Sequence, residues 1–173
     1  DRNLKRQALL ILEAAGYQLD GKTLRAPNGA PVNLELLVQR REDERLALAY
    51  RRMLAQVGIT LSVRLVDASQ YQRRLQTFDF DMIIYTYYPS LSPGNEQAYY
   101  WGSAAADTPG SRNYAGIKNA AVDAAVSALT AAATPEAFAA AARALDRALM
   151  TGHYFVPLFH TDKQWVAHWN RLE

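Results

Sequence analysis

The sequence predicts an α/β fold in which a central, mainly parallel sheet is flanked by helices. Three apolar or alternating stretches read as strands, at 32–38, 59–66 and 81–87, and the last is apolar on both faces, as at the centre of a parallel sheet. The stretch 44–57 between the first two carries apolar residues at helical spacing. Strand, helix and strand in this order predict parallel pairing with a right-handed crossover.

The segments around these strands carry clear start and stop signals. Apolar spacing predicts a helix from about Leu4 to Ala15, ended by a left-handed Gly16. Asp20-Gly21 then predicts a tight turn between two short strands. Asp43 and Asp67 are expected to cap the helices that follow the first two strands of the sheet.

The second half of the chain is predicted to be mainly helical. Asn119 is expected to cap one helix, and Thr134-Pro135-Glu136 combines a capping hydroxyl, a first-turn proline and an acid to begin another. The segments Tyr154 to Phe159 and Gln164 to Trp169 read as closing strands, and Pro157 places the first of them at a sheet edge.

Parallel strands bring the loops that follow them to one edge of the sheet. The loops after Val38, Val66 and Tyr87 are therefore expected to meet there, where open α/β sheets bind their ligands. The third of these loops is rich in Tyr, Ser, Pro and Gly. The sequence predicts a binding surface at this edge.

Composition narrows the class of protein. At 173 residues the chain is one domain or one lobe of a larger protein. Its formal net charge of +2 does not indicate nucleic acid or an anionic membrane as a partner. The absence of cysteine excludes disulfides and thiolate zinc sites, and no run approaches the roughly 18 apolar residues of a membrane span.

No catalytic or metal-binding pattern stands out. His153, His160 and His168 are the only histidines, and no acid lies at zincin spacing from them. No Gly-x-Ser-x-Gly elbow and no phosphate-binding glycine loop occurs. We therefore expect no enzyme, no cofactor and no metal. A small secreted hydrolase remains the alternative, if distant residues bring a His–carboxylate–Ser set together.

Aromatic residues are the strongest binding signal in the chain. Tyrosine and tryptophan offer a broad contact area and a polar tip at low entropic cost. Tyr85 and one of Tyr99 and Tyr100 are expected in the core, and at least two of the others on a binding surface. The set is Tyr85, Tyr87, Tyr88, Tyr99, Tyr100, Trp101 and Tyr114.

Four segments follow one another in a characteristic order: Leu12–Tyr17 with Asp20-Gly21, Leu54–Val57 with Gly58-Ile59, Phe78–Met82, and Asn119 with Val122-Asp123. In this order and spacing, nearly the whole chain resembles the C-terminal lobe of the large periplasmic peptide-binding proteins of ABC importers, the extracellular solute-binding family 5. The resemblance implies that residues 1–173 form a single lobe of a two-lobed (type II) binding protein whose other lobe is absent.

Other segments resemble the subfamily that captures microcin C and other oligopeptides: Ser90–Glu96, Trp101–Asp107, Gly110–Asn113 and Ala144–Arg147. The resemblance implies a periplasmic, monomeric protein that binds oligopeptides or peptide-like compounds between two lobes. It would deliver them to ABC permease subunits and meet the membrane only through that transporter. A lobe that serves only ligand sensing or docking to the transporter is a further alternative.

The resemblance and the aromatic pattern together define a predicted ligand-binding set. Arg112 either meets a ligand carboxylate or phosphate, or braces its loop against Glu96. Relatives that bind free peptides hold the ligand ammonium with an aspartate near the position of Ser90, so this loop is not expected to require a free N-terminus. The expected ligand contacts are Tyr87, Tyr88, Ser90, Ser92, Asn95, Trp101, Arg112 and Asn113.

Overall fold

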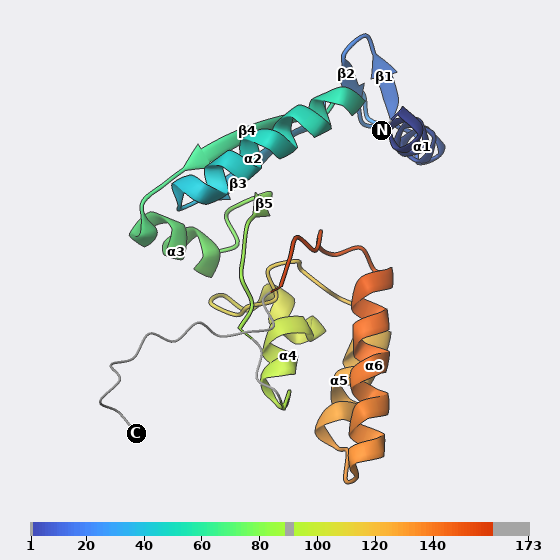
Figure 1. The fold of residues 1–173 in the computed structure, drawn as a ribbon, viewed down its shortest axis with the longest axis vertical. Coiled ribbons are helices and arrows are strands. Elements are labelled where there is room, and N and C mark those ends of the chain that lie inside the picture. Colours follow the sequence, from blue (N-terminus) through green and yellow to red (C-terminus); the bar gives the residue numbers. More distant parts are fainter. Residues whose placement is uncertain (1, 89–91, 161–173) are drawn as a thin grey trace, which may run out of the picture.

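The computed structural model describes residues 2–88 and 92–160. Its main sheet has three parallel strands in the order β4-β3-β5, with β3 (Asn33–Val38) between β4 (Thr60–Leu65) and β5 (Met82–Ile83). Helix α2 (Arg41–Leu54) connects β3 to β4, and α3 (Ala68–Gln76) connects β4 to β5 (Figure 1). The predicted parallel sheet with helical crossovers is confirmed.

The two faces of the sheet carry separate cores, because successive side chains of a strand point to opposite faces. Leu36 and Val38 pack with Leu61 against Ala47 of α2. Leu37, which is fully buried, packs on the other side with Tyr71 and Leu75 of α3 and with residues that follow them. The sheet is therefore flanked by α2 on one face and by α3 on the other.

Ahead of the sheet, the predicted helix and hairpin are both present. Helix α1 (Arg2–Ala14) is followed by Gly16 with φ of +86°, and the strands β1 (Gln18–Asp20) and β2 (Thr23–Arg25) pair antiparallel across the predicted turn. Gly58, with φ of +83°, lies where a Cβ atom would come within 2.6 Å of the backbone nitrogen of Leu24. A side chain at this position would push the hairpin away from the turn that leads into β4.

The predicted cap of the first crossover helix was wrong by three residues. Helix α2 begins at Arg41, its N-cap position is Arg40, and Asp43 lies inside the first turn. The carboxylate of Asp43 accepts two hydrogen bonds from the Arg40 guanidinium, at 2.8 and 3.0 Å, instead of capping the backbone. Acids in a first turn are favoured by the positive helix end, so they extend the helix upstream of the expected cap. The Asp67 cap of α3 is confirmed by its bond from Gln70 N.

The third strand is shorter than predicted and lies at the edge of the described sheet rather than at its centre. Only Met82 and Ile83 pair with β3. Beyond them, the Tyr71 hydroxyl donates a 2.9 Å hydrogen bond to the carbonyl of Ile84, so a side chain takes the place of a ladder partner. The apolar run 84–87 instead supplies side chains to an aromatic cluster, which an apolar pattern alone does not distinguish from a buried strand.

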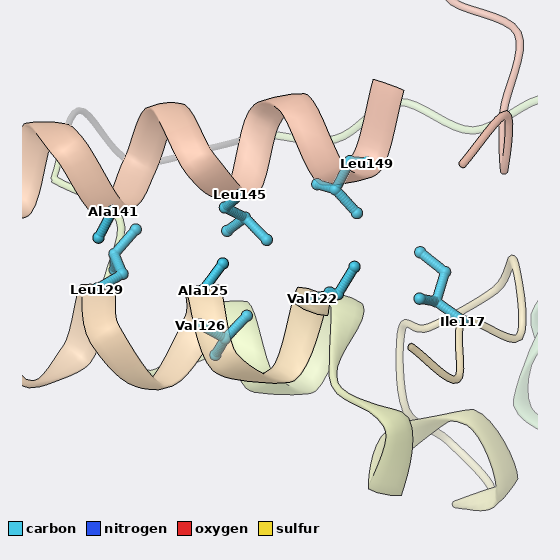
Figure 2. Packing of buried hydrophobic residues seen from close by; sticks show 8 residues of the cluster. All are labelled: Ile117, Val122, Ala125, Val126, Leu129, Ala141, Leu145 and Leu149. Carbon is cyan, nitrogen blue, oxygen red and sulfur yellow. The ribbon is translucent and has the colours of Figure 1, made fainter. Parts of the chain in front are cut away.

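The second half of the chain forms a helical layer. Short helices α4 (Glu96–Trp101) and η2 (Ser103–Asp107) precede the helical pair α5 (Ala120–Thr130) and α6 (Pro135–Thr151). The predicted caps are confirmed, since Asn119 accepts from Ala121 N and Thr134 from Ala137 N. Figure 2 shows the core of this pair, with Leu145 and Leu149 of α6 facing Val122, Ala125 and Leu129 of α5. None of the helices in the described ranges is long and apolar enough to cross a membrane.

The predicted closing strand at 154–159 was wrong. The segment that follows α6 is extended but pairs with no strand among the described residues. Its apolar residues are mostly exposed, and Phe159 is 87% accessible. Alternation of apolar and polar residues shows that a segment is compatible with a sheet. A strand also needs a neighbouring strand whose backbone groups can pair with its own. The second predicted closing strand, 164–169, lies outside the described residues.

Candidate ligand-binding site

Five aromatic rings form a continuous cluster where the chain leaves β5. The Tyr87 ring centre lies 4.9 Å from that of Tyr85 and 4.9 Å from that of Trp101. Tyr100 is 5.7 Å from Tyr87, and Tyr114 is 4.8 Å from Tyr85. The contacts are edge-on or tilted, which aromatic pairs favour. The segment that follows β5, helix α4 and the loop after η2 thus contribute rings to one aromatic surface.

Burial keeps the phenols at the centre of this cluster neutral. Desolvation, with smaller contributions from neighbouring tyrosines, raises the pKa of Tyr87 far above its ordinary value. Desolvation likewise raises the pKa of Tyr114, followed by the effect of Tyr85. Both hydroxyls therefore keep their protons at neutral pH, so a phenol of this cluster can both donate and accept a hydrogen bond.

Phe155 adds a ring that the sequence analysis did not place in the site. Its centre lies 6.0 Å from that of Trp101, and the Trp101 indole is oriented by a 2.9 Å hydrogen bond from Nε1 to Gln97 Oε1. Phe155 is 38% exposed. The sequence offered no local signal for this contact, because the residue follows a helix that begins 34 positions beyond Trp101.

Tyr88 is the last described residue before the loop that precedes α4. It is 85% exposed. Strands β3 and β5 are parallel neighbours, so the loops that follow them leave the same edge of the sheet. The loops that follow two of the parallel strands therefore lie close together, as the strand order predicts.

Arg112 lies against the aromatic surface and not against Glu96. Its Nη1 donates a 2.8 Å hydrogen bond to the Tyr100 hydroxyl, and its guanidinium carbon is 5.6 Å from the centre of that ring. Glu96 instead accepts from Gly94 N at 2.9 Å and from Gln97 Nε2 at 3.1 Å. Of the two predicted roles of Arg112, bracing through Glu96 is wrong. The side chain is exposed and keeps further donors for an anion.

Asn113 is buried, unlike the other described residues of the predicted ligand-binding set. It is 1% exposed, and its side chain donates to the carbonyls of Gly102 and Ile117 and accepts from Ile117 N, at 2.8 to 3.0 Å. These bonds hold the loop between η2 and α5. In this arrangement, Asn113 supports the loop that carries Arg112 and presents no polar atom to the surface.

The remaining predicted contacts lie in or beside the loop that precedes α4. Asn95 occupies the N-cap position of α4 without a side-chain cap bond and is exposed, and Ser92 is exposed as well. Ser90 lies outside the described residues. The structure thus groups Tyr87, Trp101 and, through Tyr100, Arg112.

The hydroxyl–carboxylate pair most suggestive of catalysis is Ser103 with Asp123. Ser103 Oγ donates to Asp123 Oδ2 at 2.6 Å, accepts from Asn119 N at 3.1 Å, and its backbone nitrogen donates to Asp123 Oδ1 at 2.8 Å. No histidine side chain joins this pair in the described part of the chain. Within that same part, no group of three or more potential metal ligands gathers. The Ser103–Asp123 pair joins η2 to α5.

Replacing Asp123 by Asn is expected to lower stability at neutral pH but not in acid. The Ser103 hydroxyl, and then its backbone N–H, hold the pKa of Asp123 below its ordinary value. A lowered folded-state pKa gives stability that is present above the unfolded pKa of about 3.9 and is lost as pH falls through the folded value. Urea unfolding at pH 7 should show a loss of about 1 kcal/mol, on the scale of one typical net hydrogen bond, because asparagine can still accept one of the two bonds.

The control is Asp146→Asn on the exposed face of α6, which should change stability little at either pH. The difference between wild type and Asp123→Asn should disappear near pH 2. A loss that stayed constant from pH 7 to pH 2 would contradict the assigned hydrogen bonds.

Fold and surface together define a class of protein: an α/β lobe that presents aromatic rings and a cation at the carboxyl edge of a parallel sheet, without catalytic groups among the described residues. The sequence profile of the bacterial extracellular solute-binding proteins, family 5 Middle, matches residues 4–109. The chain belongs to this family, which is one of binding proteins and not of enzymes.

Individual relatives agree with this assignment. A Brucella melitensis protein named as a binding protein is 47% identical over 173 residues, all of this chain. An Agrobacterium fabrum protein named as a peptide-binding protein is 44% identical over 172 residues, 99% of this chain. The chain spans only 28% of the length of each of these relatives.

The fold also matches a solved structure. The oligopeptide-binding protein AppA from Bacillus subtilis, in complex with a nonapeptide, superimposes with a TM-score of 0.77 at 17% identity. The match covers 86% of this chain and 30% of AppA. At this level of identity the likeness establishes the shared lobe fold.

Proposed function

We propose that this chain is the C-terminal ligand-binding lobe of a periplasmic solute-binding protein. That protein captures oligopeptides or peptide-like compounds between two lobes and delivers them to the permease of an ABC importer. The observation that carries the proposal is the aromatic surface of Tyr87, Tyr100 and Trp101 at the exit of β5. The family assignment and the names of the relatives support it.

The surface suits a ligand whose side chains vary. Flat, partly exposed rings pack apolar groups of many shapes. Arg112 adds a donor for a carboxylate or phosphate beside Tyr100. Closure of two lobes over the ligand favours the closed state through the additional contacts made there. We propose that the protein falls within the microcin C and oligopeptide subfamily, which its segments Ser90–Glu96 and Trp101–Asp107 resemble, and that it acts as a monomer.

Ligand identification tests the proposal directly. Mass spectrometry of the small molecules released from the purified full-length protein should find peptides or peptide conjugates. Titration calorimetry with those compounds should then give saturable binding that weakens in Trp101→Ala. A full-length protein that binds no peptide and closes on none would overturn the proposal and favour a lobe that only docks on the transporter.

Blocking the N-terminus of a peptide ligand is expected to cost little affinity. The described loop residues 85–88 and 92–95 include no acid, and neither do residues 89–91. Acetylation should cost well under the roughly 2–5 kcal/mol lost when one partner is removed from a buried charge pair. Calorimetry of the full-length protein with matched free and acetylated peptides measures this difference.

A matched variant sharpens the test. Ser90→Asp introduces an anion where relatives that bind free peptides keep one, so it should shift preference toward free N-termini. Abolition of wild-type binding by acetylation would mean that another acid holds the ammonium. Glu96 at the start of α4 is the first acid to test in that case.

A further inference from the structure

The segment that leads into the aromatic surface has little backbone pairing of its own. Strand β5 shares only two residue pairs with β3, Leu36 with Met82 and Leu37 with Ile83. The preceding residues 77–81 are irregular, and Phe78 adopts a left-handed φ of 53°. An open hollow of about 520 Å³, lined by Phe78, Phe80 and Tyr114, among others, borders this segment, while Phe80 also packs against the cluster around Leu37.

Besides local backbone hydrogen bonds such as Asp79 N to Arg74 O, an ion-pair network holds the segment, and Arg74 is at its centre. Arg74 Nε donates to the Asp79 carbonyl at 2.7 Å and to Asp79 Oδ2 at 2.9 Å, while Nη2 lies 2.7 Å from Glu35 Oε1. The side chains of Arg74 and Glu35 are 15% and 26% exposed. One guanidinium therefore ties α3, the middle strand β3 and the turn before β5 together, with Glu35 on the more shielded side and the 68% exposed Asp79 on the other.

Asp81 completes the attachment on the strand side. Its Oδ2 accepts a 2.8 Å hydrogen bond from the backbone nitrogen of Glu35, one position before the first residue pair of β3 and β5. This bond extends the short ladder by means of a side chain. The two acids that flank Phe80 thus have separate partners, Arg74 for Asp79 and Glu35 N for Asp81.

Residues 77–81 are connected to the candidate site through a series of ring contacts. Phe80, between the two acids, lies 6.3 Å from the ring centre of Tyr114. Tyr114 lies 4.8 Å from Tyr85, and Tyr85 lies 4.9 Å from Tyr87. In addition, Gly110 N donates to the carbonyl of Gln76 at 2.9 Å, so the loop that carries Arg112 is tied to the end of α3.

We propose that Arg74, through Glu35 and Asp79, is a positioning residue that sets the orientation of the Tyr85–Tyr87–Trp101 surface for ligand without touching the ligand. This inference rests on the proposed function. The guanidinium is suited to the task because its Nε donates to two oxygens of Asp79 while Nη2 forms an ion pair with Glu35 on its other side, whereas a lysine ammonium is a point charge on a flexible stem. A binding site held by such supporting contacts loses affinity when its rings can shift.

The test uses the full-length protein with Arg74→Met, Arg74→Lys and the control Arg64→Met. Arg64 is 55% exposed and reaches Glu35 only at 3.4 Å. Incorporated 3-fluorotyrosine, assigned through single Tyr→Phe variants, reports ring environments without ligand. Arg74→Met should shift the fluorine signals of Tyr85, Tyr87 and Tyr114, Arg74→Lys should shift them less, and the control should leave them in place.

Calorimetry with a synthetic nonapeptide pool gives the second measurement. Arg74→Met should weaken binding about tenfold, the scale on which lost supporting contacts weaken a preorganised site, with the control unchanged. A lower melting temperature with unchanged fluorine signals and unchanged affinity would overturn the inference and leave Arg74 a stabilising residue only. If the wild type binds no nonapeptide, the proposed function fails on that point, and the fluorine signals alone decide the role of Arg74. If Arg74→Met does not fold, the smaller change in Arg74→Lys carries the same comparison.

Discussion

The isolated 173-residue chain is expected to bind peptides about a thousandfold more weakly than the full-length protein. A ligand held between two lobes divides its contacts between them, and the closing motion is lost when one lobe is missing. A peptide bound at 1 µM has a binding free energy of about −8.2 kcal/mol, and half of that corresponds to a dissociation constant of about 1 mM.

Titration calorimetry of both proteins with the same peptides measures this difference. The melting temperature of the isolated chain should be recorded first, so that an unfolded lobe is not read as a non-binding one. Equal affinity of the isolated chain and the full-length protein would refute capture between two lobes. It would instead place the whole site on this chain.

Most of the fold was predictable because its signals are local. Asp67, Asn119 and Thr134 cap their helices as their side chains require, and the Asp20-Gly21 turn joins the two strands that flank it. Parallel order followed from alternating strands separated by amphipathic helices. These features depend on a few neighbouring residues, so a single sequence contains what determines them.

The mistaken elements depend on partners that are distant in the sequence. The run 84–87 leaves the sheet because the Tyr71 hydroxyl takes the Ile84 carbonyl, and the segment 154–159 lacks a pairing strand among the described residues. The carboxylate of Asp43 is bound by the guanidinium of Arg40, the residue at the observed N-cap position, and so does not cap the helix. In each case the local pattern was compatible with two structures, and a contact made elsewhere decided between them.

The candidate site was predictable in kind but not in detail. Tyrosine and tryptophan in a loop after a strand indicated a binding surface, and Tyr87 with Trp101 is at its centre. The burial of Asn113, the packing of Phe155 and the Arg112–Tyr100 pair were not visible, because each needs the relative placement of η2, α4 and the segment after α6. The site residues proposed from the sequence therefore included both partly exposed rings and buried supporting side chains such as Asn113.

Leu37→Ala is expected to destabilise the protein and to weaken peptide binding, whereas Leu36→Ala should only destabilise it. The two leucines are neighbours on β3 and are 0% and 3% exposed, so each truncation should cost about 2–5 kcal/mol. They point to opposite faces. Leu36 packs on the α2 side, and Leu37 belongs to the cluster that includes Ile83, Tyr85 and Tyr114, beneath the aromatic surface.

This pair separates the support of the site from general stability. Urea unfolding should give similar losses for the two variants, while calorimetry of the full-length protein with its peptide should show weaker binding only for Leu37→Ala. A cavity under Tyr85 lets the ring move, and Tyr87 is in contact with that ring at 4.9 Å. Equal loss of affinity in both variants would mean that the sheet as a whole, and not the face beneath the rings, determines binding.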